Sequence, residues 1–320
     1  MDQVAITREQ LEKHQVWAYL VAAGTGLTLG IHLQPEVHDA ILYVPLGVLL
    51  YATFVQVPMA RLPAALKDRR YLVATILVNF IFVPAAVWSL AWLAPREPTI
   101  LPGIFMVLLV PCTDWFIVFS HLGKGDVKLA LASTPLLLFG QFLILPFYLW
   151  LFLSETLGEV IRLAPFVQVF FLLIVLPLML AAATEFLAGR RPAVQRSISF
   201  MSWAPVTCLA VVLFLIAFAE GSAALNVFAG LGRVALVFVL YLAAAAGIGL
   251  LTARLLGLPE KAGRTLIFSA GTGNSFVVLP FSLALPAGWE AAVAVVVLQP
   301  LVELLGLLVY LRVVPRLKVT

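Results

Sequence analysis

The chain has 320 residues, of which 63% are hydrophobic and only 11% are charged, and its mean hydropathy is +1.08. A soluble domain carries about a quarter charged residues, so this composition argues against a soluble enzyme or binding module and indicates a polytopic membrane protein. The net charge of +4 does not indicate nucleic-acid binding, because the positions of the basic residues explain it better. Both cysteines, Cys112 and Cys208, fall in apolar segments, which predicts no disulfide framework.

Ten apolar segments are long enough to cross a bilayer. The first follows a polar N-terminus that lacks the signal-peptide pattern, so we expect it to be retained as a span. In chain order the segments cover about 16–33, 41–60, 71–94, 102–122, 129–153, 163–187, 200–219, 231–256, 265–285 and 289–313. Short loops rich in Pro, Gly and charge separate them, for example AGRRPAVQRS after the sixth segment. The predicted fold class is an all-α polytopic membrane protein with ten transmembrane helices.

The basic residues predict the orientation of these spans. With ten segments, 17 of the 20 Lys and Arg residues fall on one side, and only Arg96, Arg162 and Arg233 fall on the other. Basic loops stay in the cytoplasm, so both termini are expected there, in a multi-pass protein of the inner cell membrane.

The fourth segment contains Pro111, Cys112, Thr113 and Asp114 in direct succession. Proline removes a backbone donor and obstructs the carbonyl one turn earlier, which predicts a broken or kinked helix. Broken backbone in a membrane is tolerated only where it is buried in protein or lines a polar cavity. A carboxylate at that depth is costly and is kept mainly for function. The sequence therefore predicts a site at this point.

The ninth segment has a similar interruption, SAGTGNSFVVLP from Ser269 to Pro280. Paired interrupted segments in the two halves of a chain point to the binding site of a transporter built from inverted repeats. We expect one repeat at about 16–153 and the other at about 163–313, within a single transmembrane unit covering 1–320. An offset of 162 residues relates Cys112 to Asn274 and Gln141 to Glu303, which agrees with this division.

Each polar residue of the interrupted segments has a functional and a structural interpretation. The thiolate of Cys112 can act as a nucleophile or a soft ligand at the site, and the alternative is that Cys112 is a small buried side chain. Burial of Asp114 favours the protonated carboxyl, which suits a proton carrier; the alternatives are a counter-charge for sodium or a cap for backbone amides. Glu303 is expected to be a second titrating group or part of a cation site, and the alternative is that it forms a structural hydrogen bond between helices.

The remaining candidates are uncharged. Thr113, Asn274 and Ser275 are expected to bind substrate, and Thr272 to share in ion coupling, because unwound glycine-rich backbone exposes carbonyls and amides. The alternative is a glycine notch that packs helices together. Gln141 and Asn79 are expected in ion coupling, although an amide often only links two helices.

Several short motifs in order resemble the arsenite-efflux permeases of the arsenical-resistance type, within the bile acid/sodium symporter superfamily. They are Asn79-Phe80 with Pro84, Leu90-Ala91-Trp92-Leu93, Pro111-Cys112-Thr113, Gly125-Asp126, Gln141, Thr272-Gly273-Asn274-Ser275-Phe276, and Gln299-Pro300-Leu301-Val302-Glu303. One departure is that the family's glutamate after the ninth-helix motif is absent, since Val277 and Val278 follow Phe276. Either the carboxylate has moved to Asp114 across the crossing, or the substrate differs.

The resemblance implies two inverted five-helix repeats, with panel helices 1, 2, 6 and 7 and core helices 3–5 and 8–10. Helices 4 and 9 would be unwound where they cross at the substrate site. Members move small anionic or neutral solutes, driven by sodium or by proton exchange.

The leading hypothesis is proton-coupled efflux of arsenite, antimonite or a similar small metalloid oxyacid. The alternative is sodium-coupled symport of a small organic anion, and an intramembrane enzyme or a sensor is a third class. The expected partners are a small-molecule substrate, H+ or Na+ as coupling ion and the lipid bilayer, with no nucleic acid; a homodimer remains open. No cofactor, resident metal or catalytic residue is predicted, and Cys112 would ligate As(III) only transiently.

Overall fold

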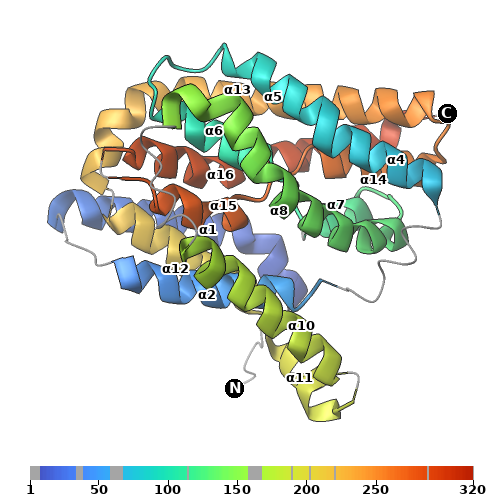
Figure 1. The fold of residues 1–320 in the computed structure, drawn as a ribbon, viewed down its shortest axis with the longest axis horizontal. Helices are drawn as coiled ribbons and strands as arrows, with labels where there is room; N and C mark the ends of the chain where they lie inside the picture. The colour runs from blue at the N-terminus through green and yellow to red at the C-terminus, as the bar shows by residue number, and fades with distance from the viewer. Residues whose placement is uncertain are drawn as a thin grey trace. The chain divides into compact units, whose positions relative to one another are not determined.

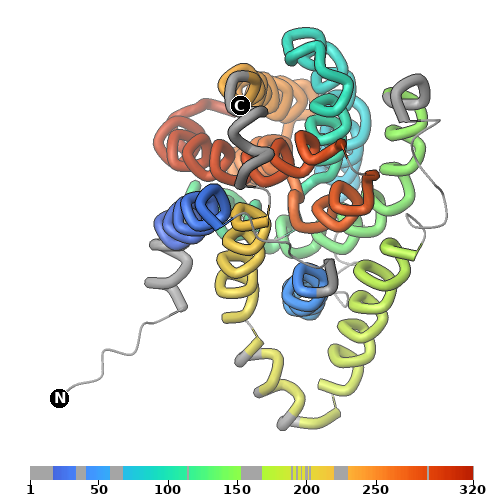
Figure 2. The backbone as a smooth tube through the Cα atoms, turned by 90° about the vertical axis from the view of Figure 1, so that its left-hand side faces the viewer, coloured from blue at the N-terminus to red at the C-terminus, as the bar shows by residue number. Residues whose placement is uncertain are grey.

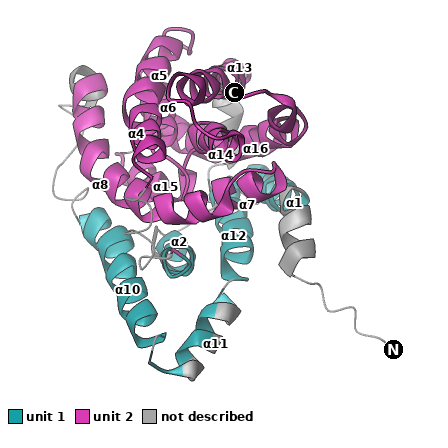
Figure 3. Ribbon diagram, turned by 90° about the vertical axis from the view of Figure 1, so that its right-hand side faces the viewer, with its two compact units in different colours: residues 1–56, 164–227 teal, residues 57–163, 228–320 magenta. Residues whose placement is uncertain are grey.

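The computed structural model of the chain describes residues 8–33, 39–57, 68–113, 115–157, 168–188, 190–201, 203–219, 221–286 and 288–319 (Figure 2). Within these residues the secondary structure is helical, apart from an isolated β-bridge. The helices group into two compact units, coloured separately in Figure 3. Unit 1 comprises Met1–Gln56 and Ala164–Val227, and unit 2 comprises Val57–Leu163 and Phe228–Thr320.

Unit 1 contains helices from both halves of the chain. They are α1 (Arg8–Leu33), α2 (Asp39–Phe54), the π-helix η3 (Phe171–Val175), α10 (Leu176–Ala188), α11 (Pro192–Met201) and α12 (Ala204–Ala219). Helix α2 packs on α12 and on α10, and the hydroxyls of Tyr51 and Thr184 lie 3.0 Å apart between α2 and α10. This hydrogen bond satisfies two polar side chains between otherwise apolar helices.

Two glycines allow α1 to pack closely on α12. A Cβ at Gly26 would collide with the backbone oxygen of Phe214, and one at Gly30 with that of Phe218. Small residues four apart are a common way for membrane helices to bring their backbones together. The contact between α1 and α12 therefore depends on these two positions.

Helix α11 corrects the sequence-based prediction of a loop at 188–197. The chain instead forms a helix from Pro192 to Met201, and α12 begins after it at Ala204. Pro192 is the first helical residue, where its fixed φ suits a helix and its missing N–H has no intrahelical partner to lose. No glycine or proline follows before Met201, so nothing in the sequence stops the helix sooner.

Unit 2 carries the interrupted segments. Its helices are α4 (Arg69–Leu77), the π-helix η2 (Val78–Phe82), α5 (Val83–Ala91), α6 (Ile100–Leu108), α7 (Trp115–Leu122), α8 (Val127–Leu157), α13 (Gly221–Leu255, whose first residues fall in unit 1), α14 (Glu260–Ala270), α15 (Ser275–Leu283), α16 (Glu290–Val313) and the short 3-10 helix η4 (Val314–Arg316). Figure 1 shows α4, η2 and α5 following one another along a single rod, with α13 as another long helix of this unit.

Five helical stretches among the described residues are long and apolar enough to cross a membrane. They are Arg69–Ala91, Val127–Phe152, Gln168–Ala188, Gly230–Leu255 and Glu290–Arg316. Shorter apolar helices cover Trp17–Leu33, Ile41–Phe54 and Ala204–Ala219. Large apolar side chains on these helices are exposed, and Leu143 is 81% exposed, as expected for helices surrounded by lipid. The chain is a multi-pass membrane protein.

The Gly125-Asp126 motif fixes the start of α8. A Cβ at Gly125 would lie 2.6 Å from the hydroxyl of Thr265, so glycine allows this close approach to α14. The Asp126 N–H donates to the same hydroxyl at 2.7 Å. The Asp126 carboxylate accepts from the N–H groups of Lys128 and Leu129, at 2.9 and 3.2 Å, and so caps the helix.

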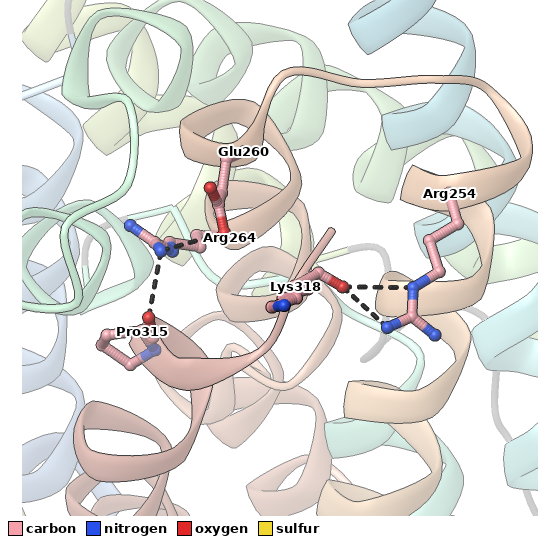
Figure 4. Close-up of polar contacts among 5 residues, drawn as sticks. All are labelled: Arg254, Glu260, Arg264, Pro315 and Lys318. Carbon is pink, nitrogen blue, oxygen red and sulfur yellow. Dashed lines mark hydrogen bonds and ion pairs between the residues drawn. The ribbon is translucent and has the colours of Figure 1, made fainter. Parts of the chain in front are cut away.

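The C-terminal residues are tied to the neighbouring ends of α13 and α14 (Figure 4). Arg254 donates through Nε and Nη2 to the carbonyl of Lys318, at 3.2 and 2.6 Å. Arg264 donates to the carbonyl of Pro315 at 3.0 Å and pairs with Glu260 at 3.2 Å. These bonds satisfy the carbonyl groups of Pro315 in η4 and of Lys318 just after it, which would otherwise need water.

Candidate functional site

Two of the predicted membrane-crossing segments are each divided into a pair of short helices. In the fourth segment α6 ends at Leu108 and α7 begins at Trp115, so the interruption includes Pro111, as the sequence predicts. In the ninth segment α14 ends at Ala270 and α15 begins at Ser275. The residues between the paired helices lie within unit 2.

The two interruptions pair with each other as a short antiparallel bridge between Pro111 and Gly273. The N–H of Cys112 donates to the carbonyl of Thr272 at 3.0 Å, and the N–H of Asn274 donates to the carbonyl of Val110 at 2.8 Å. Buried backbone groups need such partners, and here each unwound segment supplies them to the other. A Cβ at position 273 would lie 2.7 Å from the carbonyl oxygen of Val107, so the close approach requires glycine.

The second helix of each pair is capped by a side chain from the crossing. The N–H of Trp115 donates to Sγ of Cys112 at 3.3 Å, and the N–H of Val277 donates to Oδ1 of Asn274 at 3.3 Å. The amide of Asn274 also donates to the hydroxyl of Thr113 at 3.4 Å. Because α6 and α14 end here and α7 and α15 begin here, the crossing brings together the carbonyl ends of two helices and the amide ends of two others.

A hydrogen-bond network on α16 supports the ninth-segment half of the crossing. The Glu303 carboxylate accepts from the Gly273 N–H at 2.7 Å and from the side-chain amide of Gln299. Gln299 in turn accepts from the hydroxyl of Ser275 at 2.6 Å. All of these side chains are buried. Glu303 is therefore joined to the unwound backbone, and the network connects it to Ser275.

Gln299 is a site residue that the sequence-based candidates missed. It is one helical turn before Glu303 on the same helix, which places the two side chains on one face. This i, i+4 spacing within the Gln299-Pro300-Leu301-Val302-Glu303 motif was the available signal.

Asn79 is joined to the last turns of α14 and not directly to the crossing. Its amide donates to the carbonyl of Thr75 at 2.9 Å and to the hydroxyl of Ser269 at 3.1 Å. Asn79 lies in η2, and π-helical turns inside α-helices are frequent at functional sites. Ser269 was also missed as a candidate, although it opens the polar ninth-segment stretch.

The remaining predicted site residues are Asp114, Thr272 and Gln141. Asp114 lies outside the described residues. Thr272 contributes its backbone carbonyl to the crossing, and its hydroxyl donates to the carbonyl of Phe268 at 2.9 Å. Gln141 is buried in α8, and neither its Oε1 nor its Nε2 has a hydrogen-bond partner.

Several hydrogen bonds occur twice, between residues that an offset of 162 relates. In the two helix caps the donor and the acceptor both move forward by 162 residues. In the two backbone bonds of the crossing, which join the two halves, the donor moves forward by 162 residues and the acceptor moves back by 162. Away from the crossing, the hydroxyl of Tyr148 donates to the carbonyl of Phe80, and that of Tyr310 donates to the carbonyl of Leu242. In the first half Pro84 has no N–H to give to the carbonyl of Phe80, which leaves that oxygen available for Tyr148.

The crossing offers a thiol, hydroxyls, a carboxamide and a carboxylate in a buried setting. Among the described residues no three His, Cys, Asp or Glu side chains are grouped to hold a metal ion. A single thiol beside neutral hydrogen-bonding groups is suited to reversible capture of a small solute, because one thiolate ligand releases more readily than several.

Comparison with known proteins gives the family. The family model described as Sodium Bile acid symporter family matches residues 43–226, which is more than half of the chain. A search of curated proteins found no match to the chain. The matched range includes α6, α7, α8 and the first interrupted segment with Cys112. On this match the chain belongs to the sodium bile acid symporter family of membrane transporters.

Proposed function

We propose that the chain is a proton-coupled efflux transporter for arsenous acid, antimonous acid or a similar small metalloid oxyacid. The observation that carries the proposal is the buried thiol of Cys112 in the crossing, where it caps α7. Sulfur is a weak hydrogen-bond acceptor, and Ser, Thr, Asp or Asn caps a helix better. The affinity of a thiolate for trivalent arsenic and antimony gives a reason for a poor helix cap at this point.

The repeated hydrogen bonds support an architecture of ten spans in two inverted repeats. An offset of 162 residues relates the crossing, the caps and the tyrosine bonds of the two halves. We take unit 1 to be the panel domain and unit 2 to be the core domain of such a carrier. The distribution of Lys and Arg supports cytoplasmic termini in the inner cell membrane.

Asp114 and Glu303 are the proposed coupling groups. A buried carboxyl that is uncharged in one state and charged in another can carry a proton as its cavity opens to either side. Glu303 also fixes the unwound backbone through the Gly273 N–H, so its protonation would change the stability of the crossing itself. Asn79 and Thr272 complete the residues assigned to ion coupling. The residues assigned to substrate binding are Cys112, Thr113, Asp114, Asn274 and Ser275.

The test is arsenite and antimonite accumulation in cells that lack their own efflux system, with proton and sodium gradients imposed separately. We expect lower accumulation with the wild-type protein, and we expect the effect to follow the proton gradient. Cys112→Ser should abolish the effect while the protein still reaches the membrane, because serine is the better helix cap. Asp114→Asn should abolish it as well.

Cys208→Ser is the matched control, because Cys208 is the second cysteine of the chain and lies in unit 1 on α12. It should export as well as the wild type. Export by Cys112→Ser at the wild-type rate would contradict the role of the thiol, and an effect that follows the sodium gradient alone would contradict proton coupling.

A second candidate is sodium-coupled symport of a small organic anion, which the family membership favours. The carboxylate of Glu303 and the oxygens of Asn274 and Ser275 are hard ligands of the kind that sodium takes. This function would tolerate Cys112→Ser and would need an inward sodium gradient. The same cells, given a labelled organic anion with and without sodium, separate the two candidates.

A further inference from the structure

Gln141 is a buried carboxamide without a hydrogen-bond partner. Its side chain is 1% exposed in the middle of α8, and both Oε1 and Nε2 lack a partner. Burying an amide without compensating hydrogen bonds costs free energy, and native proteins seldom leave both atoms unsatisfied without a reason. The packing of α8 does not account for a polar residue at this position. Leu137, one turn earlier, belongs to a buried apolar cluster, and Ile144, about one turn later, packs against the same cluster.

The repeat relation explains why Gln141 has no partner. The offset of 162 residues takes Gln141 to Glu303, and it takes Pro111 to Gly273. Glu303 accepts the N–H of Gly273 at 2.7 Å. Pro111 has no N–H, so the corresponding donor does not exist in the first half of the crossing.

Other hydrogen bonds support the offset of 162 residues that relates Gln141 to Glu303. Seven residues after Gln141, Tyr148 donates to the carbonyl of Phe80, and seven residues after Glu303, Tyr310 donates to the carbonyl of Leu242. The crossing bonds of Cys112 and its counterpart obey the same offset. Gln141 therefore occupies, in the first half, the position from which Glu303 reaches the crossing in the second half.

We infer that Gln141 is a solute-binding residue of unit 2, and that its ligand is an uncharged hydroxyl-bearing solute. The inference rests on the proposed function for the location of the site, and it names a contact that the thiol does not supply. In the second half a backbone N–H of the protein occupies one oxygen, Oε2, of the Glu303 carboxylate. In the first half the missing N–H of Pro111 leaves the amide of Gln141 for the solute.

The chemistry of the amide selects the class of ligand. A carboxamide both donates, through Nε2, and accepts, through Oε1. A bare cation would satisfy only Oε1, and a carboxylate or other anion would satisfy only Nε2. A hydroxyl group donates and accepts, so an uncharged polyhydroxy acid such as arsenous or boric acid can satisfy both atoms of Gln141 at once.

The test measures thermal unfolding of the purified full-length protein in detergent, titrated separately with arsenous acid, boric acid, sodium chloride and choline chloride. Boric acid has hydroxyl groups of the same kind but forms no stable bond to thiols, so it reports on Gln141 independently of Cys112. The variants are wild type, Gln141→Leu, Cys112→Ser and Ser282→Ala. Ser282 is the control, because its buried hydroxyl is already bonded to the carbonyl of Leu279 in its own helix.

Both acids should raise the melting temperature of the wild type and of Ser282→Ala. Boric acid should also stabilise Cys112→Ser, whereas Gln141→Leu should bind each acid at least about tenfold more weakly. Without any solute, Gln141→Leu should melt at or above the wild-type temperature, because it removes an unsatisfied amide from an apolar setting.

The inference is overturned if Gln141→Leu binds both acids as the wild type does, if it melts below the wild type without solute, or if neither acid stabilises the wild type. Stabilisation by sodium chloride but not choline chloride, lost in Gln141→Leu, would overturn it in favour of a cation ligand. Failure of the proposed function looks different: arsenite export would be absent in cells while boric acid still stabilised the wild type through Gln141.

Discussion

At the scale of single residues, the two halves of the crossing use different side chains at equivalent positions. Asn274 caps α15 with an oxygen, while Cys112 caps α7 with a sulfur. Glu303 is bonded to the Gly273 N–H, while Gln141 is its equivalent in the first half, where Pro111 stands in place of Gly273 and has no N–H. The chemistry proposed for the solute is thus concentrated in the first half, and the second half is more fully occupied with its own backbone.

Two substitutions of Glu303 separate the contribution of its hydrogen bond to the crossing from the contribution of its charge. Glu303→Gln keeps an acceptor for the Gly273 N–H, whereas Glu303→Leu leaves that buried donor without a partner. We expect Glu303→Leu to lower the free energy of unfolding by about 1–3 kcal/mol and Glu303→Gln to lower it by less. Thermal or denaturant unfolding of the purified proteins in detergent measures the difference.

Glu290→Gln is a suitable control, since Glu290 lies on the same helix, and its bond to the Gly288 N–H is exposed. It should have little effect. A Glu303→Leu protein as stable as the wild type would show that the Gly273 N–H does not depend on this carboxylate.

At the scale of helices, the sequence predicts where backbone regularity fails but not how the freed groups are satisfied. Pro111 and the glycines of the ninth segment mark both interruptions. Neither segment by itself reveals that the carbonyls of Val110 and Thr272 accept hydrogen bonds from backbone N–H groups of the other interrupted segment. This pairing joins residues that are far apart in the chain. For the same reason the network from Ser275 through Gln299 to Glu303 was only partly predicted.

The prediction of a loop at 188–197 failed for a local reason. Charged residues around Arg190 and Arg191 suggested a polar connection, but charge does not stop a helix in the way that glycine does. Pro192 favours a helix start, and α11 follows from it. Five of the predicted spans correspond to long apolar helices, whereas a short helix with several polar residues, such as α11, gives no apolar signal in the sequence.

The packing of α1 on α12 gives a test at this scale. Gly30→Leu should lower the free energy of unfolding by at least about 1–3 kcal/mol, because its side chain would have to displace the backbone of Phe218. Gly24→Leu on the same helix should be tolerated, since nothing lies within 4 Å of a Cβ there. The melting temperatures of the two variants in detergent decide the matter, and equal effects would contradict the assigned contact.

At the scale of the whole molecule, the chain separates into two units whose roles follow from their contents. Unit 2 holds both interrupted segments, the buried polar network and Gln141. Unit 1 is built from apolar helices that pack through Gly26, Gly30 and a hydroxyl pair between Tyr51 and Thr184. In our account unit 2 binds the solute, and the rearrangement of the carrier exposes its crossing to one side of the membrane and then the other.

The most direct test of this account is the reactivity of Cys112 in membrane vesicles, measured in the Cys208→Ser background with a charged, membrane-impermeant thiol reagent. The side chain is only 3% exposed, so its modification requires the crossing to open to water. We predict slow labelling of Cys112 that arsenous acid reduces, with faster labelling after denaturation as the positive control. Labelling that is unaffected by arsenous acid, or absent until the protein is denatured, would contradict the crossing as the solute site.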